Sequence, residues 1–256
     1  MRILCLPGYG TNPDIMKRQL SLLLKICDPS WEFDFLQAKV PCRPAPGPFL
    51  CWTEDFGPTE NRAALDLIHY TFATEGPFDG VFGFSQGASM VAAYLLEQAS
   101  LHPDRNLPVN SGYSTRRRQF LRRTRVISNE VVHLPEPART SVTLLAETLT
   151  IMKPVHGRSL SYLFDRPATE IPCVLLPDVY AVRLGIPTLH VLARDDPAPL
   201  QRSSEVCRGF CDPTQRRVFR HSAVHGLPRE SGESGEVREF VEFIRELSEE
   251  ARESRL

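Results

Sequence analysis

The segment GPFDGVFGFSQGA, residues 76–88, joins an apolar run to a serine that lies between two glycines. Residues 78–84 have the length and the apolar composition of a buried strand bounded by turn residues. From Ala88 to Glu97 the apolar residues follow helical spacing. The segment therefore predicts a strand, a sharp turn and a helix in immediate succession.

The turn itself, Gly83-Phe84-Ser85-Gln86-Gly87, matches the Gly-x-Ser-x-Gly pattern of a nucleophile elbow. Such a turn holds the serine at the top of a sheet, and side chains at Gly83 and Gly87 would clash with the neighbouring strand and helix. The pattern alone is not specific, so its place between a strand and a helix carries the interpretation. We expect Ser85 to be a nucleophile; the alternative is a tight turn with an incidental serine.

The alternation of strand and helix continues on both sides of this segment. Strands are expected at residues 3–6, 31–35, 186–193 and 217–220, and helices from residue 13, over 61–72 and from residue 237 onward. Short apolar strands between amphipathic helices are typical of a mostly parallel sheet covered by helices on both faces. The sequence therefore predicts an α/β protein with a doubly wound sheet.

Two regions lack this pattern. The stretch from Pro41 to Pro58 is rich in proline and is expected to be irregular. Residues 101–184 contain no strand as clear as those around them, but do contain six arginines between positions 116 and 125. We interpret this cluster as a solvated loop or lid rather than a nucleic-acid contact. The expected organisation is one domain over residues 1–256, with 101–184 as a divergent insert or lid.

The composition limits the class of protein. The 256 residues are 42% hydrophobic and carry a net charge of -1, which argues against a main role in binding nucleic acid or an anionic membrane. No apolar run approaches the roughly 18 residues that span a bilayer, and the N-terminus lacks a secretory signal pattern. Seven scattered cysteines indicate reduced thiols and a cytoplasmic protein. Cys207 and Cys211 lack the second pair of ligands that a zinc site needs, so no metal is expected.

A nucleophilic serine needs a base and an orienting acid, in the chain order serine, acid, histidine for this type of sheet. His225 lies in a loop of helix-breaking residues, where an imidazole can project over the strand ends. His221 ends a predicted strand and is expected to be structural. Asp195 and Asp196 both follow a predicted strand, at the edge where open α/β sheets place their sites. We choose Asp196 as the acid, and Asp195 stays open as the alternative.

Acyl chemistry also needs N–H donors for an oxyanion. One expected donor is the backbone N–H of Gln86, directly after the serine. The loop from Pro7 to Asn12 follows the first predicted strand, and its glycines let the backbone approach a substrate. We assign the second donor to Tyr9 or Gly10. This chemistry implies no metal and no redox cofactor.

Taken together, these residues resemble the FSH-type serine hydrolases, a family with the α/β-hydrolase fold. The matching segments are LCLPGYGTN (4–12), GPFDGVFGFSQGA (76–88), IPTLHV (186–191) and residues 221–228. The resemblance implies that Ser85 is the nucleophile, Asp196 the acid and His225 the base.

The proline-rich segment VPCRPAPG, residues 40–47, is particularly similar to fungal family members from polyketide clusters. The resemblance implies a thioesterase or esterase acting on an acyl ester or thioester, with a possible acyl carrier protein as partner. Where the family usually has a histidine before the first glycine, this chain has Pro7. Pro7 and the weak pattern over 101–184 favour a second hypothesis, an α/β-hydrolase scaffold without catalysis that binds an apolar ligand or a partner.

Overall fold

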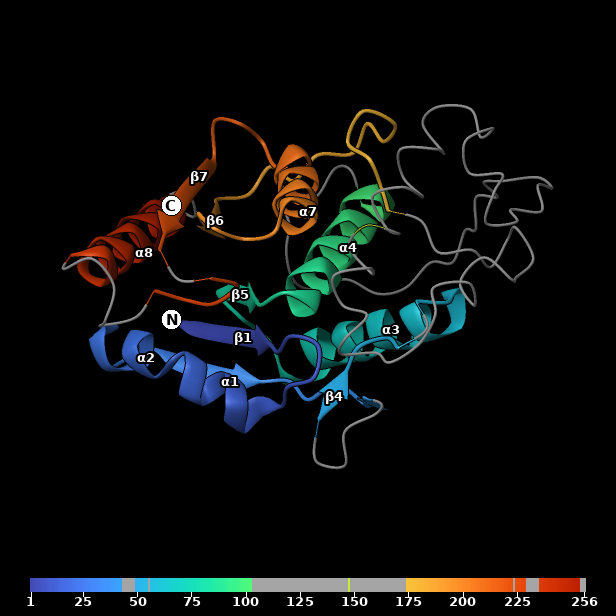
Figure 1. Cartoon of the computed structure of the whole chain (residues 1–256), viewed down its shortest axis with the longest axis horizontal. Helices are drawn as coiled ribbons and strands as arrows, with labels where there is room; N and C mark the ends of the chain where they lie inside the picture. Colours follow the sequence, from blue (N-terminus) through green and yellow to red (C-terminus); the bar gives the residue numbers. More distant parts are fainter. Residues whose placement is uncertain are drawn as a thin grey trace.

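The computed structural model describes residues 1–42, 49–54, 56–102, 147, 174–222, 224–228 and 235–253 (Figure 1). The strands are β1 (Arg2–Leu6), β2 (Glu32–Phe35), β3 (Val40–Pro41), β4 (Leu50–Cys51), β5 (Gly80–Gly83), β6 (Thr188–Ala193) and β7 (Arg216–His221). The helices are α1 (Pro13–Gln19), α2 (Ser21–Ile26), α3 (Pro58–Glu75), α4 (Gln86–Leu101), α7 (Ala198–Gly209) and α8 (Glu236–Glu253). Most of the expected insert or lid over 101–184 lies outside the described residues, and the arginine cluster lies entirely outside them.

The strands of the main sheet pair in parallel, as the α/β interpretation predicts. β1 lies between β2 and β5, and β6 pairs with β7. Among the described residues β5 and β6 share no ladder, so the expected continuous sheet is divided into two parallel ladders. Their side chains meet instead in a shared core, where Phe82 and Phe84 of the β5 region and Val191 of β6 pack against the same cluster.

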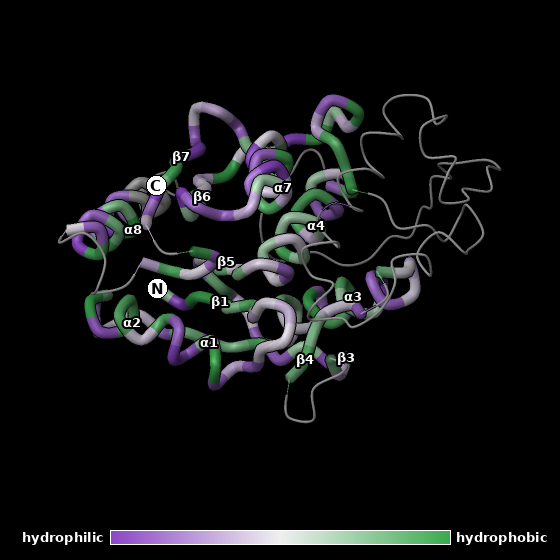
Figure 2. Tube along the Cα trace, in the orientation of Figure 1, coloured by the Kyte–Doolittle hydropathy of each residue, from purple (hydrophilic) through white to green (hydrophobic). Residues whose placement is uncertain are grey.

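Alternate residues of β1 enter two different cores. Leu4 and Leu6 belong to a cluster shared with α3 and α4, whereas Cys5 belongs to a cluster shared with α1, α2 and α8. This period of two is what a strand buried on both faces requires. Hydropathy along the chain follows the same division, with the apolar strand β1 inside and mixed helices such as α8 outside (Figure 2). The predicted coverage of both faces by helices is confirmed.

Asn12 caps the first helical segment, which is not continuous. Asn12 Oδ1 accepts a hydrogen bond from the backbone N–H of Ile15 at 2.9 Å, which closes the start of α1. The chain then bends at Leu20, and α2 begins at Ser21. The bend brings both Leu20 and Leu23 into the core, where they are 1% and 7% exposed.

The prediction that residues 41–58 are irregular is only partly right. β3 and β4 form a short antiparallel hairpin there, with Val40 opposite Cys51, and α3 begins at Pro58. Proline is compatible with both places, because it is tolerated in short edge strands and favoured in the first turn of a helix. The hairpin also pairs with the loop after β1, through an isolated bridge between Thr11 and Leu50.

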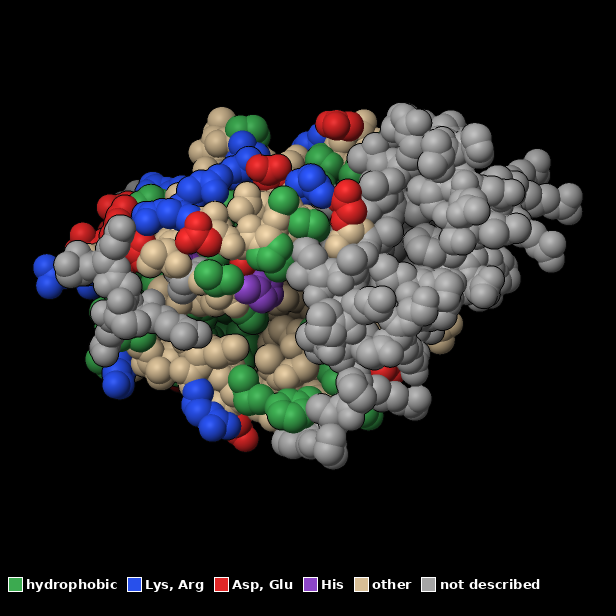
Figure 3. Space-filling model, viewed as in Figure 1, with side chains coloured by type: hydrophobic (Ala, Val, Ile, Leu, Met, Phe, Trp, Pro, Cys, Tyr) green, Lys and Arg blue, Asp and Glu red, His purple; other side chains and the backbone are tan. Residues whose placement is uncertain are grey.

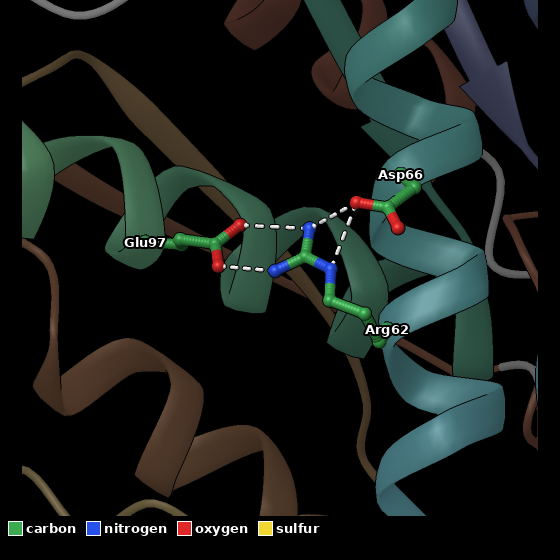
Figure 4. Close-up of polar contacts among 3 residues, drawn as sticks. All are labelled: Arg62, Asp66 and Glu97. Carbon is green, nitrogen blue, oxygen red and sulfur yellow. Dashed lines mark hydrogen bonds and ion pairs between the residues drawn. The ribbon is translucent and has the colours of Figure 1, made fainter. Parts of the chain in front are cut away.

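An ion-pair cluster joins α3 to α4 (Figure 4). The Arg62 guanidinium donates to both carboxylate oxygens of Glu97, at 2.5 and 3.3 Å, and to Asp66 at 2.8 Å. All three side chains are partly exposed, so the cluster contributes little free energy of folding, on the order of 1 kcal/mol. The cluster instead restrains the position of α4, the helix that follows Ser85, relative to α3.

Candidate active site

Ser85 lies on a strained turn between β5 and α4. Its backbone has φ 51° and ψ -118°, in the region of positive φ that side chains other than glycine rarely adopt. A Cβ at Gly87 would lie 2.2 Å from the carbonyl oxygen of Leu6, and one at Gly83 would lie 2.5 Å from Cα of Ala88. Both glycines are therefore required by close packing against β1 and α4, as expected from the sequence.

The imidazole of His225 reaches this serine from the loop after β7. Nε2 of His225 lies 3.1 Å from Oγ of Ser85, within hydrogen-bond distance. His225 also has a positive φ, of 36°. Its ring packs beside Phe84, with ring centroids 5.6 Å apart, so an apolar wall flanks one side of the imidazole.

Asp196 lies beside the other nitrogen of the same ring, Nδ1. Its Oδ1 accepts a hydrogen bond from the backbone N–H of His225 at 2.8 Å and lies 3.4 Å from Nδ1. The Asp196 side chain is 14% exposed and is therefore largely buried, whereas the side chain of the neighbouring Asp195 is exposed. Gln201 donates from Nε2 to the backbone oxygen of Asp196 at 2.7 Å, which fixes the loop after β6. The structure thus brings together Ser85, His225 and Asp196, which are far apart in the chain.

His221, the other histidine in this region, takes a different position. It ends β7, is fully buried and stacks on Phe219 with ring centroids 6.4 Å apart. Burial lowers the pKa of His221, opposed in part by the nearby charges of Glu236 and Asp196. Its backbone oxygen accepts a hydrogen bond from the N–H of Arg194, so the residue also braces the chain leading to Asp196.

The loop after β1 lies directly against the serine turn. A Cβ at Gly8 would lie 3.2 Å from Cβ of Ser85, which shows how closely the two backbones approach. The N–H of Gly10 donates to the carbonyl oxygen of Leu50 at 3.0 Å. That N–H is therefore engaged with the β3–β4 hairpin, which disfavours Gly10 as the second oxyanion donor.

The side chain of Tyr9 lies close to the β3–β4 hairpin. Burial, followed by the neighbouring thiols of Cys42 and Cys51, raises the pKa of its phenol. The phenol is therefore neutral at ordinary pH.

Two groups of residues around the site were missed by the sequence analysis. The backbone N–H of Trp52 donates to the side chain of Gln86, and its indole N–H donates to the carbonyl oxygen of Pro7 in the loop after β1. Glu236, at the start of α8, accepts from both N–H and Oγ of Ser222 and lies 3.3 Å from Arg194. No spacing in the sequence indicates either contact, because each joins segments far apart in the chain.

The surface around the site is mixed. On the face seen in Figure 3, a histidine side chain lies near the centre between hydrophobic side chains, and Lys and Arg side chains gather over β6 and β7. The side chains of Arg194 and Arg220, at the ends of these strands, are exposed to solvent. Within the described ranges no group of three or more His, Cys, Asp and Glu side chains is arranged to hold a metal ion.

The chain is similar in sequence to known serine hydrolases and esterases. A family model described as serine hydrolase (FSH1) matches residues 1–237. The chain is 34% identical over 208 residues to serine hydrolase cnsH of Penicillium expansum, a match that covers 73% of this chain and 86% of that protein. It is 29% identical over 271 residues to esterase alnB of Emericella nidulans, covering 91% and 92%. Among solved structures, an extracellular alpha/beta-hydrolase from a Paenibacillus species matches at 13% identity, covering 96% and 98%, with a TM-score of 0.41.

Three further observations bear on the class of protein. Among the described helices, none has both the length and the apolar character needed to cross a bilayer. Six cysteines of the described part are free thiols, and five of these are buried. Burial raises the pKa of Cys5 to about 12, so this thiol is protonated and unreactive at ordinary pH.

Proposed function

The chain belongs to the serine hydrolase (FSH1) family, and from that premise we propose that it hydrolyses an acyl ester or thioester through a triad of Ser85, His225 and Asp196. The observation that carries the proposal is the pair of contacts on one imidazole. Nε2 of His225 lies 3.1 Å from Oγ of Ser85, while Asp196 Oδ1 lies 3.4 Å from Nδ1. Nucleophile, base and orienting acid are thus in the order that general-base activation of a serine requires.

In the first step, Nε2 of His225 accepts the hydroxyl proton as Ser85 Oγ attacks the substrate carbonyl carbon. The resulting imidazolium is stabilised by the Asp196 carboxylate, which also keeps the remaining proton on Nδ1. The imidazolium then protonates the leaving alcohol or thiol as the tetrahedral intermediate collapses to an acyl-serine. A water molecule, deprotonated by the same imidazole, hydrolyses the acyl-serine and restores the free hydroxyl.

The negative charge on the carbonyl oxygen needs donors that are already in place. We assign the backbone N–H of Gln86 as the first donor, because this residue follows Ser85 and begins α4, whose N-terminus favours negative charge. The backbone N–H of Tyr9 is the second, in the loop that packs directly against the serine turn.

For the substrate, we propose an acyl group from secondary metabolism, presented as an oxygen ester or as a thioester on the arm of an acyl carrier protein. The printed names of the relatives, serine hydrolase and esterase, support the reaction class. Exposed Arg194 and Arg220, at the ends of β6 and β7, would favour a partner or arm with negative charge. We further propose a single cytoplasmic domain over 1–256, with 101–184 as a divergent insert or lid.

The first test is Ser85→Ala, with Ser89→Ala, an exposed serine in the first turn of α4, as the matched control. Turnover of a p-nitrophenyl ester and labelling by a fluorophosphonate probe should both be lost in Ser85→Ala, with kcat falling by roughly 10⁶-fold. Ser89→Ala should behave as the parent protein. Unchanged labelling of Ser85→Ala would contradict the assignment, and a parent protein that neither labels nor turns over would favour the scaffold without catalysis.

The second test compares leaving groups. One acyl chain is supplied as a p-nitrophenyl ester, as an N-acetylcysteamine thioester and as a carrier-protein thioester, and kcat/KM is measured for each. A preference for the carrier-bound form that weakens with added salt supports the partner proposal. Equal values for the two thioesters would exclude recognition of the carrier.

A further inference from the structure

The loop that supplies the second oxyanion donor is held by an unusual contact. Trp52, only 2% exposed, donates from its indole Nε1 to the carbonyl oxygen of Pro7 at 2.8 Å. Pro7 stands where a histidine side chain is expected from the resemblance to the family, and a proline ring cannot donate a hydrogen bond to brace the loop. In this chain the indole N–H of Trp52 supplies a hydrogen bond to the loop from elsewhere in the sequence.

The same segment also holds the residue after the nucleophile. The backbone N–H of Trp52 donates to Gln86 Oε1 at 2.9 Å, and Gln86 Nε2 donates to the backbone oxygen of Thr53 at 2.7 Å. Both Gln86 and Thr53 are buried, at 8% and 0% exposed. Water does not compete for these bonds, so each restrains the geometry more firmly than a surface bond would.

Residues 52 and 53 thus connect the two backbone segments from which the oxyanion donors come. One bond fixes the peptide plane between Pro7 and Gly8, because a planar amide turns as a unit when its carbonyl is held. The other two fix the side chain of Gln86. Donors to an oxyanion act only within about 2.7–3.1 Å of it, so the spacing between the two segments matters for the transition state.

We propose that Trp52 is a positioning residue for the oxyanion hole: its indole N–H, bonded to Pro7, sets the distance between the amides of Tyr9 and Gln86. The inference rests on the proposed function, since those amides are the donors assigned there. It predicts that losing the indole N–H weakens binding of the transition state and leaves binding of the ground-state substrate almost unchanged.

The test is Trp52→Phe, which keeps an aromatic ring and removes the N–H. The matched control is Trp31→Phe, at the only other tryptophan, which packs beside Phe33 with ring centroids 6.4 Å apart. For Trp52→Phe we expect kcat on a p-nitrophenyl ester to fall about tenfold, less than the 10²–10³-fold lost when a donor itself is removed. KM should change by less than about twofold, and affinity for a trifluoromethyl ketone, whose adduct carries an oxyanion, should fall in parallel with kcat.

A second variant removes the N–H without changing the shape of the side chain. In the Trp31→Phe background Trp52 is the sole tryptophan, so benzothienylalanine can be incorporated in its place with sulfur instead of N–H. The same loss of kcat and of inhibitor affinity is expected there, and this protein decides the question if Trp52→Phe does not fold.

An unchanged kcat in the benzothienylalanine protein would overturn the inference, as would a loss confined to KM. An equal loss in Trp31→Phe would overturn it too. Ser85→Ala is assayed alongside: if that variant keeps its activity, the proposed function fails, whereas an inactive Ser85→Ala with an unaffected Trp52→Phe refutes only the role of Trp52.

Discussion

At the scale of single residues, the two side chains that meet at the site both stand on strained backbone. Ser85 and His225 have φ angles of 51° and 36°, and their side chains approach to 3.1 Å. A positive φ in such residues costs about 1–3 kcal/mol, which the surrounding structure must offset. At Ser85 the offset comes from close packing of the turn against β1, and at His225 from the hydrogen bond between its N–H and Asp196.

Asp196 and Asp195 provide a direct comparison between neighbouring carboxylates. In Asp196→Asn the amide cannot stabilise the imidazolium and favours the wrong tautomer, so we expect kcat to fall by roughly 10³–10⁴-fold. Asp195→Asn should have little effect on kcat, because the Asp195 side chain is exposed. Of the two carboxylates, Asp196 is the one that contacts the His225 ring. Steady-state kinetics on an activated ester measure both variants. Equal losses in the two would show that the acid has been misassigned.

The glycines of the serine turn allow a prediction about stability. Gly87→Ala places a methyl group 2.2 Å from the carbonyl oxygen of Leu6, so β1 and α4 would have to separate. We expect the free energy of unfolding to fall by about 2 kcal/mol or more. The matched control is Gly185→Ala, where a Cβ meets nothing within 4 Å. Urea unfolding measures the difference, and similar stabilities would mean that the turn tolerates the separation.

At the scale of secondary-structure elements, the start of α8 contacts the two chain segments that lead to Asp196 and His225. Glu236, at its first residue, is 5% exposed and accepts hydrogen bonds from Ser222, at the end of β7. The same carboxylate lies 3.3 Å from Arg194, at the end of β6. Burial raises the pKa of Glu236, but the bonds from Ser222 and the charges of Arg194 and His221 outweigh it, so the net pKa lies below its ordinary value.

Because the pKa of Glu236 is lowered in the folded protein, its contribution to the free energy of unfolding should change with pH in a defined direction. The ionised Glu236 stabilises the fold above the ordinary pKa of 4.5, and that contribution is lost as the pH falls through its lower value in the folded protein. We expect Glu236→Gln to reduce the free energy of unfolding by about 1 kcal/mol at neutral pH, since its partner Arg194 is half exposed. The difference from the parent protein should shrink towards pH 3.

Chemical denaturation at several pH values measures this difference. Glu239→Gln, an exposed position in the same first turn of α8, is the control and should show no such trend. A difference that does not vary with pH in Glu236→Gln would mean that the charge of this carboxyl does not contribute to stability.

At the scale of the whole molecule, the sequence predicts what depends on local pattern. Apolar runs such as residues 3–6 and 186–193 predict β1 and β6, and alternation along β1 follows from burial on both faces. The glycines around Ser85 predict the turn, since only a residue without Cβ fits against the Leu6 carbonyl. These features depend on residues close together in the chain, so they leave a readable pattern.

The sequence analysis misses what depends on contacts between distant segments. The β3–β4 hairpin lies in a stretch whose prolines suggest irregular structure, and it pairs with the loop after β1 through Leu50. The bond from Trp52 to Pro7 spans 45 positions, and that from Ser222 to Glu236 joins a strand end to a helix start. No rule of sequence spacing predicts either bond.

One contact also has a consequence for biosynthesis. Ser85 and His225 are separated by 140 positions, and the two strands that lead to them belong to different ladders. A ribosome therefore completes the elbow long before it adds the imidazole to which we assign its activation. Under the proposed function the nascent polypeptide carries an alcohol with no proton acceptor until residue 225 has been added, so it is inert towards the esters and thioesters of the cell throughout that interval.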